Sequence, residues 1–192
     1  MLADRGFILF LGSVFATALI VMQSATTFPL HVKANGLSNA DYGLLLSLNG
    51  IIIVLAELPL TAITMHLRRN RVMALGAFLT GAAFWFVGSA ATMPALLGVV
   101  VVWTIGEMVE SPVAAAFVAD RAPENLRGRY QAAFGTMFAF AAIAGPIAGT
   151  ALFHARQGTV WGACGVLGVL GAVLALSAGR RPEPVPAGGR PG

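Results

Sequence analysis

Three glutamates stand inside long apolar segments of this chain: Glu57, Glu107 and Glu110. An ionised carboxylate near the centre of a bilayer costs roughly 2.5–3.5 kcal/mol even on a lenient insertion scale. Such a group either takes up and releases a proton, binds a cation, or is held by an arginine or by backbone groups at a helix kink. Pro59 follows Glu57 by two residues and Pro112 follows Glu110 by two. The structural alternative therefore applies most to those two acids, and Glu107 is the best candidate for function.

Neutral polar residues mark faces of the same segments. At 100° per residue, Ser24 and Thr27 share an arc of about 80° with Ser13 and Thr17 in the first segment. In the second segment, Glu57 shares an arc of about 60° with Gly50, Thr61 and Thr64, and Asn49 adds an amide on a different side. In the fourth segment, Glu107 and Glu110 align with Trp103 and Ala114. Three segments therefore carry a face suited to an aqueous cavity. The candidates for a substrate or proton pathway are Glu107, Glu110, Glu57, Ser24, Thr27 and Asn49.

Motifs of other chemistries are missing from the sequence. There is no GxSxG serine, HExxH zinc motif or Walker-type phosphate loop. Cys164 is the only cysteine, which rules out an intramolecular disulfide and a cysteine-based metal cluster. The three histidines, His31, His66 and His154, stand at loop edges, where we expect them to be solvated rather than metal-bound. We expect no enzymatic activity, no metal and no cofactor.

The elements that must position these residues are membrane-spanning helices. Of the 192 residues 57% are hydrophobic and only 10% are charged, which is too apolar for an ordinary globular surface. A spanning helix needs roughly 20 apolar residues. Six such stretches run approximately over residues 7–28, 42–65, 72–91, 95–118, 131–153 and 160–178. We expect an all-α, six-span membrane domain over residues 1–178 and a disordered tail, rich in Pro, Gly and Arg, over 179–192.

Basic residues alternate between the two sides of this arrangement. Ten lie on one side, namely Arg5, Arg68, Arg69, Arg71, Arg121, Arg127, Arg129, Arg180, Arg181 and Arg190. The other side has only Lys33 and Arg156. This positive-inside asymmetry predicts that both termini are cytoplasmic, and it argues against a nucleic-acid surface despite the net charge of +4. The first apolar run is also longer than the 7–15 residues usual for a signal-peptide core, so we read it as a membrane span and not as a secretory signal peptide.

Small residues mark the packing surfaces of the last two spans. Ala141, Gly145 and Gly149 repeat every four residues, and glycines repeat every three residues from Gly162 to Gly171. Close backbone approach at such positions is how helices associate in lipid. Pro146 removes a backbone hydrogen bond within the first of these repeats. We expect Gly145, Pro146 and Gly149 to form a hinge or packing site, and we expect kinks at all three intramembrane prolines.

Four stretches together resemble the major facilitator superfamily of transporters. PLTAITMHLRRNRVMALG (59–76) resembles the short basic loop between the second and third helices of a half of such a transporter. VADRAPENLRGRYQAAFG (118–135) resembles the passage from the fourth helix to the fifth, and GPIAG (145–149) resembles a Gly-Pro hinge in the fifth helix. FPLHVKANGLSNADYGLLLSLNGIIIVLAELPL (28–60) resembles the join of the seventh and eighth helices in efflux-type members.

The departures from the family pattern indicate which half this chain resembles. The basic loop keeps the arginines but lacks the Gly and Asp of the stronger first-half motif, and the fourth span has Glu107 and no arginine. We therefore read residues 5–178 as a C-terminal six-helix half. The family's substrate path runs between two halves, so the resemblance implies a second bundle: a separate chain, a missing N-terminal half or a second copy.

The resemblance also assigns roles to the predicted cytoplasmic loops. Arg68, Arg69, Arg71, Asp120, Arg127 and Arg129 are candidate contacts that hold an inward gate closed. Control of topology alone is the alternative for the arginines. The sequence thus predicts transport of a small organic solute across a bacterial plasma (inner) membrane, as proton-coupled efflux. The competing hypothesis is a scaffold or regulatory subunit that packs against a partner bundle and transports nothing.

Overall fold

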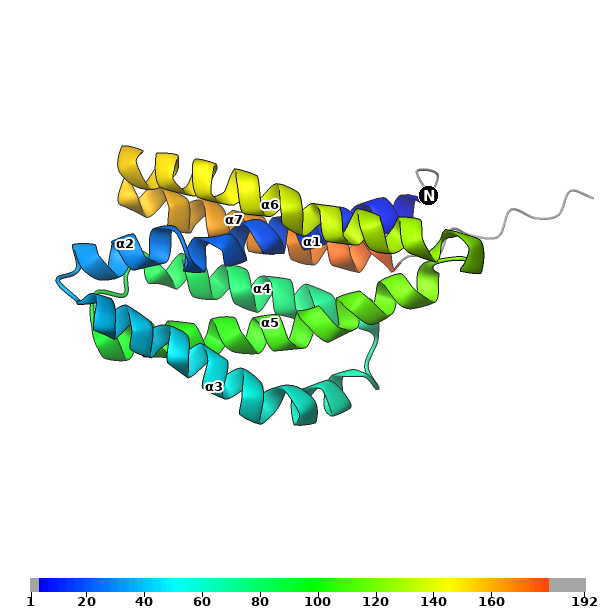
Figure 1. Cartoon of the computed structure of the whole chain (residues 1–192), viewed down its shortest axis with the longest axis horizontal. Coiled ribbons are helices and arrows are strands. Elements are labelled where there is room, and N and C mark those ends of the chain that lie inside the picture. Colours follow the sequence, from blue (N-terminus) through cyan, green and yellow to red (C-terminus); the bar gives the residue numbers. More distant parts are fainter. Residues whose placement is uncertain (1–3, 180–192) are drawn as a thin grey trace, which may run out of the picture.

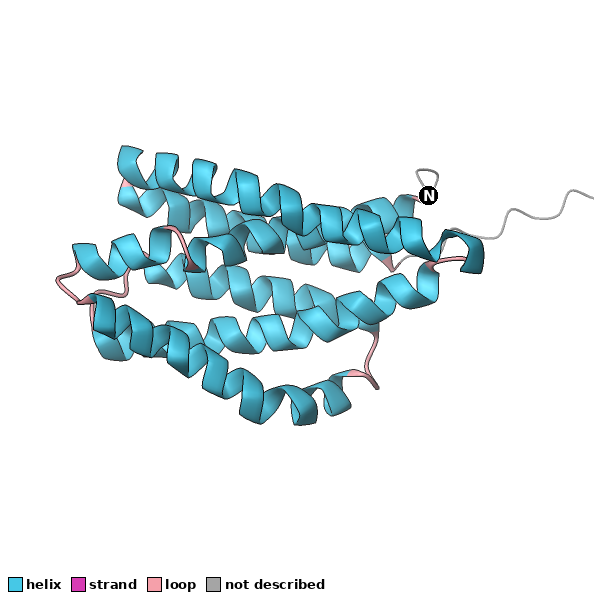
Figure 2. Ribbon diagram, viewed as in Figure 1, coloured by secondary structure: helices cyan, strands magenta, loops and turns pink. Residues whose placement is uncertain are grey.

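Helices dominate the computed structural model, which describes residues 4–179 of the chain (Figures 1 and 2). The elements are α1 (Arg5–Val21), η1 (Met22–Ser24), α2 (Thr27–Ala34), α3 (Asn39–Thr64), α4 (Arg69–Val87), α5 (Met93–Arg121), η2 (Glu124–Leu126), α6 (Arg127–Ala155) and α7 (Gln157–Ala178). Over residues 4–179 there is no strand, and six helical stretches are long and apolar enough to cross a membrane. The prediction of an all-α polytopic membrane protein is confirmed. The predicted tail lies outside the described residues, except for Gly179.

The first predicted span is not one continuous helix. Helix α1 ends at Val21, a short 3₁₀ turn follows, and α2 begins at Thr27. Pro29 lies in the first turn of α2, where its missing N–H does no harm, whereas in a continuous helix it would clash with the carbonyl of Ala25. The Ser24 hydroxyl bonds the carbonyl of Val21, and the Thr26 hydroxyl bonds that of Met22. These local bonds satisfy backbone groups that the break would otherwise leave unpaired.

Two apolar cores fill the two ends of the bundle. Trp103 and Trp161 are central to the core at the α2 end, together with Phe28 and Phe84. At the other end, α1 begins and α7 ends side by side (Figure 1). Aromatic rings fill the core there too, and Phe7 lies 4.3 Å from the ring of Tyr130. The level between the two cores contains the intramembrane acids.

One histidine departs from the sequence-based expectation. His31 is buried in the α2 end, its Nε2 donates to the carbonyl of Ala90 at 3.0 Å, and its ring meets Trp161 edge-on. Burial lowers the pKa of this imidazole. The prediction of a solvated surface role for His31 was wrong, because its side chain packs against the α4–α5 connection and Trp161 instead of facing solvent. His66 and His154 are exposed, as expected.

Glycines bring α4 and α7 into direct backbone contact. A Cβ added at Gly168 of α7 would lie 2.5 Å from the Cα of Gly81 in α4. Gly76 of α4 meets α5 in the same way, because a Cβ there would lie 2.8 Å from the carbonyl oxygen of Gly106. Part of the predicted glycine repeat of the last span is thus a packing seam, but Gly162 has open space around its Cα.

Helices α3 and α6 are the least covered of the six. Only 6% of the apolar window of α3 and 22% of that of α6 are buried, against 56% for α4. Figure 1 shows α3 bending along the half that contains Pro59, and its end diverges from α5. The helices continue through Pro112 and Pro146 as well. The bundle therefore has a closed side at the α4–α7 seam and an open side at α3 and α6.

The glycine seam can be tested within one helix. Gly168→Ala forces backbone to move against backbone, and we expect it to lower the free energy of unfolding by about 1–3 kcal/mol. Gly162→Ala, on the same helix with nothing within 4 Å of the added Cβ, should leave stability unchanged or raise it slightly. Unfolding of the two variants by a denaturing detergent provides the measurement. Equal stabilities would show that the seam is not close-packed.

Candidate functional site

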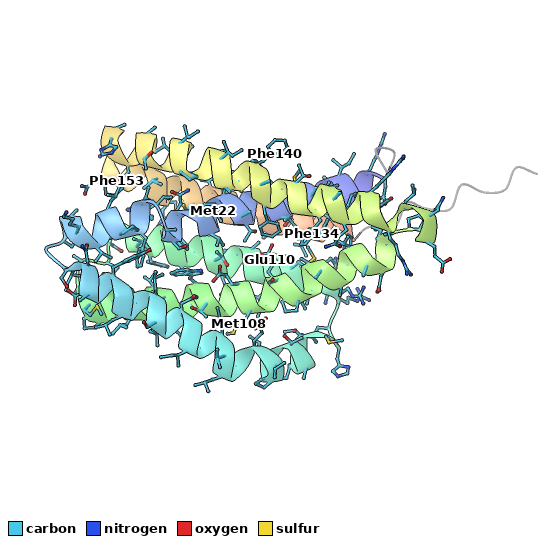
Figure 3. All side chains as sticks on the ribbon, in the orientation of Figure 1. Met22, Met108, Glu110, Phe134, Phe140 and Phe153 are labelled. Carbon is cyan, nitrogen blue, oxygen red and sulfur yellow. The ribbon has the colours of Figure 1, made fainter. Side chains whose placement is uncertain are left out.

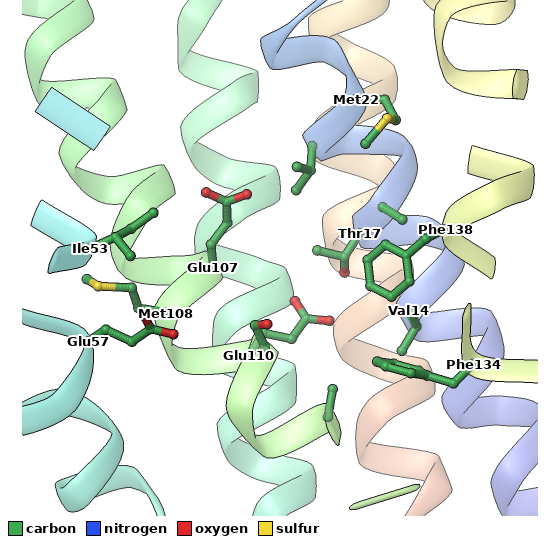
Figure 4. Close-up of a pocket in the computed structure, with 14 residues that line it drawn as sticks. Val14, Thr17, Met22, Ile53, Glu57, Glu107, Met108, Glu110, Phe134 and Phe138 are labelled. Atoms are coloured by element: carbon green, nitrogen blue, oxygen red, sulfur yellow. The ribbon is translucent and has the colours of Figure 1, made fainter. Parts of the chain in front are cut away.

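A cavity of about 260 Å³ lies between α1, α3, α5 and α6 (Figure 4). Nine of the fourteen side chains that line it are apolar. The polar ones are Thr17, Glu57, Glu107, Glu110 and Ser111. All three glutamates singled out from the sequence therefore reach one cavity, although they come from two helices. No lysine, arginine or histidine is among its lining residues.

Glu110 is the most enclosed of the three acids. Its side chain is 6% exposed, and its Oε2 is buried without a hydrogen-bond partner. On one side it packs against α4, where a Cβ added at Gly76 would lie 2.7 Å from the Glu110 Cβ. Figure 3 places Glu110 near the middle of the bundle, and Figure 4 shows its carboxylate turned towards Thr17 of α1. No arginine of the described part of the chain forms an ion pair with it.

Glu107 lies one helical turn away and is half-buried. The amide nitrogen of Asn49 on α3 donates to its Oε2 at 3.4 Å and to the Thr104 hydroxyl at 2.9 Å. Thr104 in turn donates to the carbonyl of Val100 at 2.6 Å, which fixes the hydroxyl as an acceptor for the amide. Asn49 thus connects α3 to the acid on α5. Thr104 was missed in the sequence because a threonine in an apolar helix carries no signal of its own.

Glu57 approaches the cavity from α3. It is exposed, and in Figure 4 it lies beside Met108, on the opposite side of Glu110 from Thr17 and Phe134. The acids therefore occupy the α3–α5 wall and the centre of the cavity. The rings of Phe134 and Phe138 from α6 stand on the other wall.

Ser24 and Thr27 are placed away from this cavity. The Ser24 carbonyl accepts from the Tyr42 hydroxyl at 3.1 Å, and the Thr27 hydroxyl donates to Oε1 of Gln23 at 3.0 Å. Both residues stabilise the α1–α2 break and do not line the cavity wall. The helical-wheel arc that grouped them with Thr17 assumed a continuous helix, and the break ends that register.

Gln23 connects the break to the Gly-Pro site of α6, a contact that the sequence did not suggest. Its amide nitrogen donates to the carbonyl of Leu19 at 2.9 Å and to that of Gly145 at 3.2 Å. A Cβ at Gly149 would lie 2.8 Å from the Gln23 Cδ, so a larger residue there would force the Gln23 side chain to move. Gly145 and Gly149 thus form a packing site against α1 and η1, next to Pro146.

Of the six candidate gate residues, two pair with each other. Arg69 at the start of α4 bonds Asp120 near the end of α5, and it also donates to the Ala116 carbonyl at 3.3 Å. Over residues 4–179, no ion pair forms at the other four, namely Arg68, Arg71, Arg127 and Arg129.

A second ion pair at the same end of the bundle was not predicted. Asp4 caps α1 by accepting from the backbone N–H of Phe7 at 3.1 Å, and Arg121 binds both of its carboxylate oxygens, at 2.6 and 2.8 Å. The Tyr130 hydroxyl donates to the same group at 3.4 Å. Arg121 holds the pKa of Asp4 below its usual value. The start of α1 is thereby tied to the junction of α5 and α6.

This pair should contribute more stability than the pair formed by Arg69. The side chains of Arg121 and Asp4 are 28% and 23% exposed, against 42% and 63% for Arg69 and Asp120. We expect Asp4→Asn, which keeps a capping oxygen, to cost about 1–2 kcal/mol of unfolding free energy, and Asp120→Asn at most about 1 kcal/mol.

The same variant gives a dependence on pH. Because the folded-state pKa of Asp4 is lowered, its contribution is present above the ordinary aspartate value of about 4 and is lost as pH falls through the folded value. The stability difference between wild type and Asp4→Asn should therefore be full at pH 7 and shrink below about pH 4. A difference that stayed constant with pH would contradict a charged Asp4 in the folded state.

Comparison with known proteins places this architecture in a family. The model of the Major Facilitator Superfamily matches residues 7–192. An uncharacterized MFS-type transporter of Bacillus subtilis (strain 168), YttB, is 28% identical over 133 residues, which are 68% of this chain. The match covers 33% of that relative, so the chain aligns with about a third of its length. The predicted membership of the family is confirmed, and the chain belongs to the Major Facilitator Superfamily.

Proposed function

We propose that this chain is one six-helix half of a secondary transporter that exports a small organic solute in exchange for protons. The observation that carries the proposal is the cavity between α1, α3, α5 and α6, into which Glu107 and the unpartnered Glu110 project. An intramembrane acid without a counter-charge has no packing function that an apolar residue would not serve better. Such an acid is suited to a function in which the carboxyl group is neutral in one state and charged or cation-bound in another.

The open side of the bundle supports the assignment as a half. The cavity lies among the helices that include the least covered ones, α3 and α6, whereas the seam of α4 and α7 is closed. In transporters of this kind the solute path runs between two repeats. A second bundle against α3 and α6 would complete the wall of the cavity. It is a separate chain, an N-terminal half or a second copy.

Proton and solute movement would be coupled through Glu107 of α5. With the cavity facing outwards, solute leaves as a proton binds to Glu107; with the cavity facing inwards, that proton leaves to the cytoplasm as the next solute binds. The Asn49 amide donates to the ionised form of Glu107 and holds α3 against α5. Protonation of Glu107 weakens this bond, so its charge state and the position of α3 change together.

The Arg69–Asp120 ion pair would act as part of the inward gate. Arg69 and Asp120 join the start of α4 to the end of α5, and separation of this pair would accompany opening towards the cytoplasm. The excess of arginine at this end supports an orientation with both termini in the cytoplasm of a bacterium and the bundle in its plasma membrane.

Replacement of Glu107 by glutamine tests the coupling. In inside-out membrane vesicles with an imposed pH gradient, the transporter that contains this chain should accumulate at least one of three dyes, a cation, an anion and a neutral compound. Glu107→Gln should reduce accumulation at least about tenfold, because it removes the exchangeable proton without changing the shape of the side chain. Glu124→Gln, an exposed acid of η2 outside the cavity, serves as the matched control.

Undiminished, gradient-driven accumulation by Glu107→Gln would overturn its coupling role. If no dye is accumulated by wild type, and the glutamine variant instead loses its association with a partner bundle, the chain is a scaffold or regulatory subunit.

A further inference from the structure

We infer that the transported solute is an organic cation with an apolar, ring-containing body. This inference rests on the proposed function and names the substrate class of the same cavity.

Charge sets the sign of the solute. Three carboxylates line the cavity, and no basic side chain is among its fourteen lining residues. On the wall that this chain supplies, an anionic solute would meet three acids and no counter-charge in a region of low dielectric, where like charges repel strongly. A neutral solute would leave the acids without a partner. A cation compensates them.

Glu110 supplies an observation independent of the number of acids. Glu110 is only 6% exposed, it is one of the residues that line the cavity, and its Oε2 is buried without a hydrogen-bond partner. A buried polar atom without a partner costs free energy. A proton or a positively charged ligand would reach the Glu110 carboxylate from the cavity, because α4 packs closely against the other side at Gly76.

The spacing of the acids argues against a metal ion. Within the described part of the chain no three acidic, histidine or cysteine side chains approach closely enough to hold one. Divalent metals require several oxygen ligands at short, fixed distances. A quaternary ammonium or phosphonium group requires only diffuse negative charge and aromatic faces, which separated carboxylates supply.

The two walls of the cavity fix the rest of the solute. Phe134 and Phe138 stand opposite the α3–α5 wall, on which Glu57 and Glu107 lie (Figure 4). A solute with a charged centre and a ring system can place its charge against the acids and its rings against the phenylalanines. Binding sites for drug-sized molecules combine a mostly apolar lining with a few polar groups in the same way.

Two ions of matched shape and opposite charge test the inference. Equilibrium binding of labelled tetraphenylphosphonium to the purified transporter in detergent should be saturable, and labelled tetraphenylborate, assayed in a separate sample, should not bind saturably. Glu107→Gln combined with Glu110→Gln should weaken tetraphenylphosphonium binding at least about tenfold, whereas Glu124→Gln should bind like wild type. Glu57→Gln changes an exposed position that the core does not depend on, and it should also weaken tetraphenylphosphonium binding. This variant keeps the test valid if the double substitution impairs folding.

Saturable binding of tetraphenylborate in the separate sample, or unchanged phosphonium binding in both Glu57→Gln and the double variant, would overturn the inference, as would the absence of saturable phosphonium binding. Such a result leaves the proposed function intact if the vesicles still accumulate the neutral or anionic dye. The proposed function fails separately, when none of the three dyes is accumulated.

Discussion

An ionisable side chain in the hydrocarbon region must be covered by protein or reached by water, because lipid offers it neither charge nor hydrogen bonds. Glu110 is the strictest case in this molecule, since it is buried and one of its oxygens has no partner. The arrangement around it follows from that requirement. Gly76 lets α4 close one side, and the cavity opens on the other. The packing of the helices and the cavity are therefore linked, because Glu110 can be reached only from the cavity.

The glycine seam supplies the rigid half of this construction. At Gly81 and Gly168 the backbones of α4 and α7 touch, which leaves no slack for these two helices to slide. Helices α3 and α6 have few such contacts and stand at the open side. Movement during a transport cycle would be concentrated there. The Asn49 amide connects one of these loosely held helices directly to the carboxylate of Glu107.

Much of the architecture could be predicted because lipid imposes one strong rule, that each span be apolar and helical. The intramembrane acids were recognised by the same rule. The α1–α2 break was missed, because the polar residues around it were read as one face of a continuous helix, although Pro29 offered a signal. The bond between Asp4 and Arg121 joins residues 117 positions apart. It could not be read from the sequence, because local patterns do not fix which helix ends meet.

We propose that a second helix bundle covers the open face of α3 and α6. Photo-crosslinking in native membranes can test this contact, with a benzoylphenylalanine placed at Phe138 on the cavity face or at Val166 on the exposed surface of α7. We expect the probe at Phe138 to yield adducts with peptides of a second six-helix bundle and the probe at Val166 to yield lipid adducts. Lipid adducts alone at Phe138, with protein adducts at Val166, would contradict it.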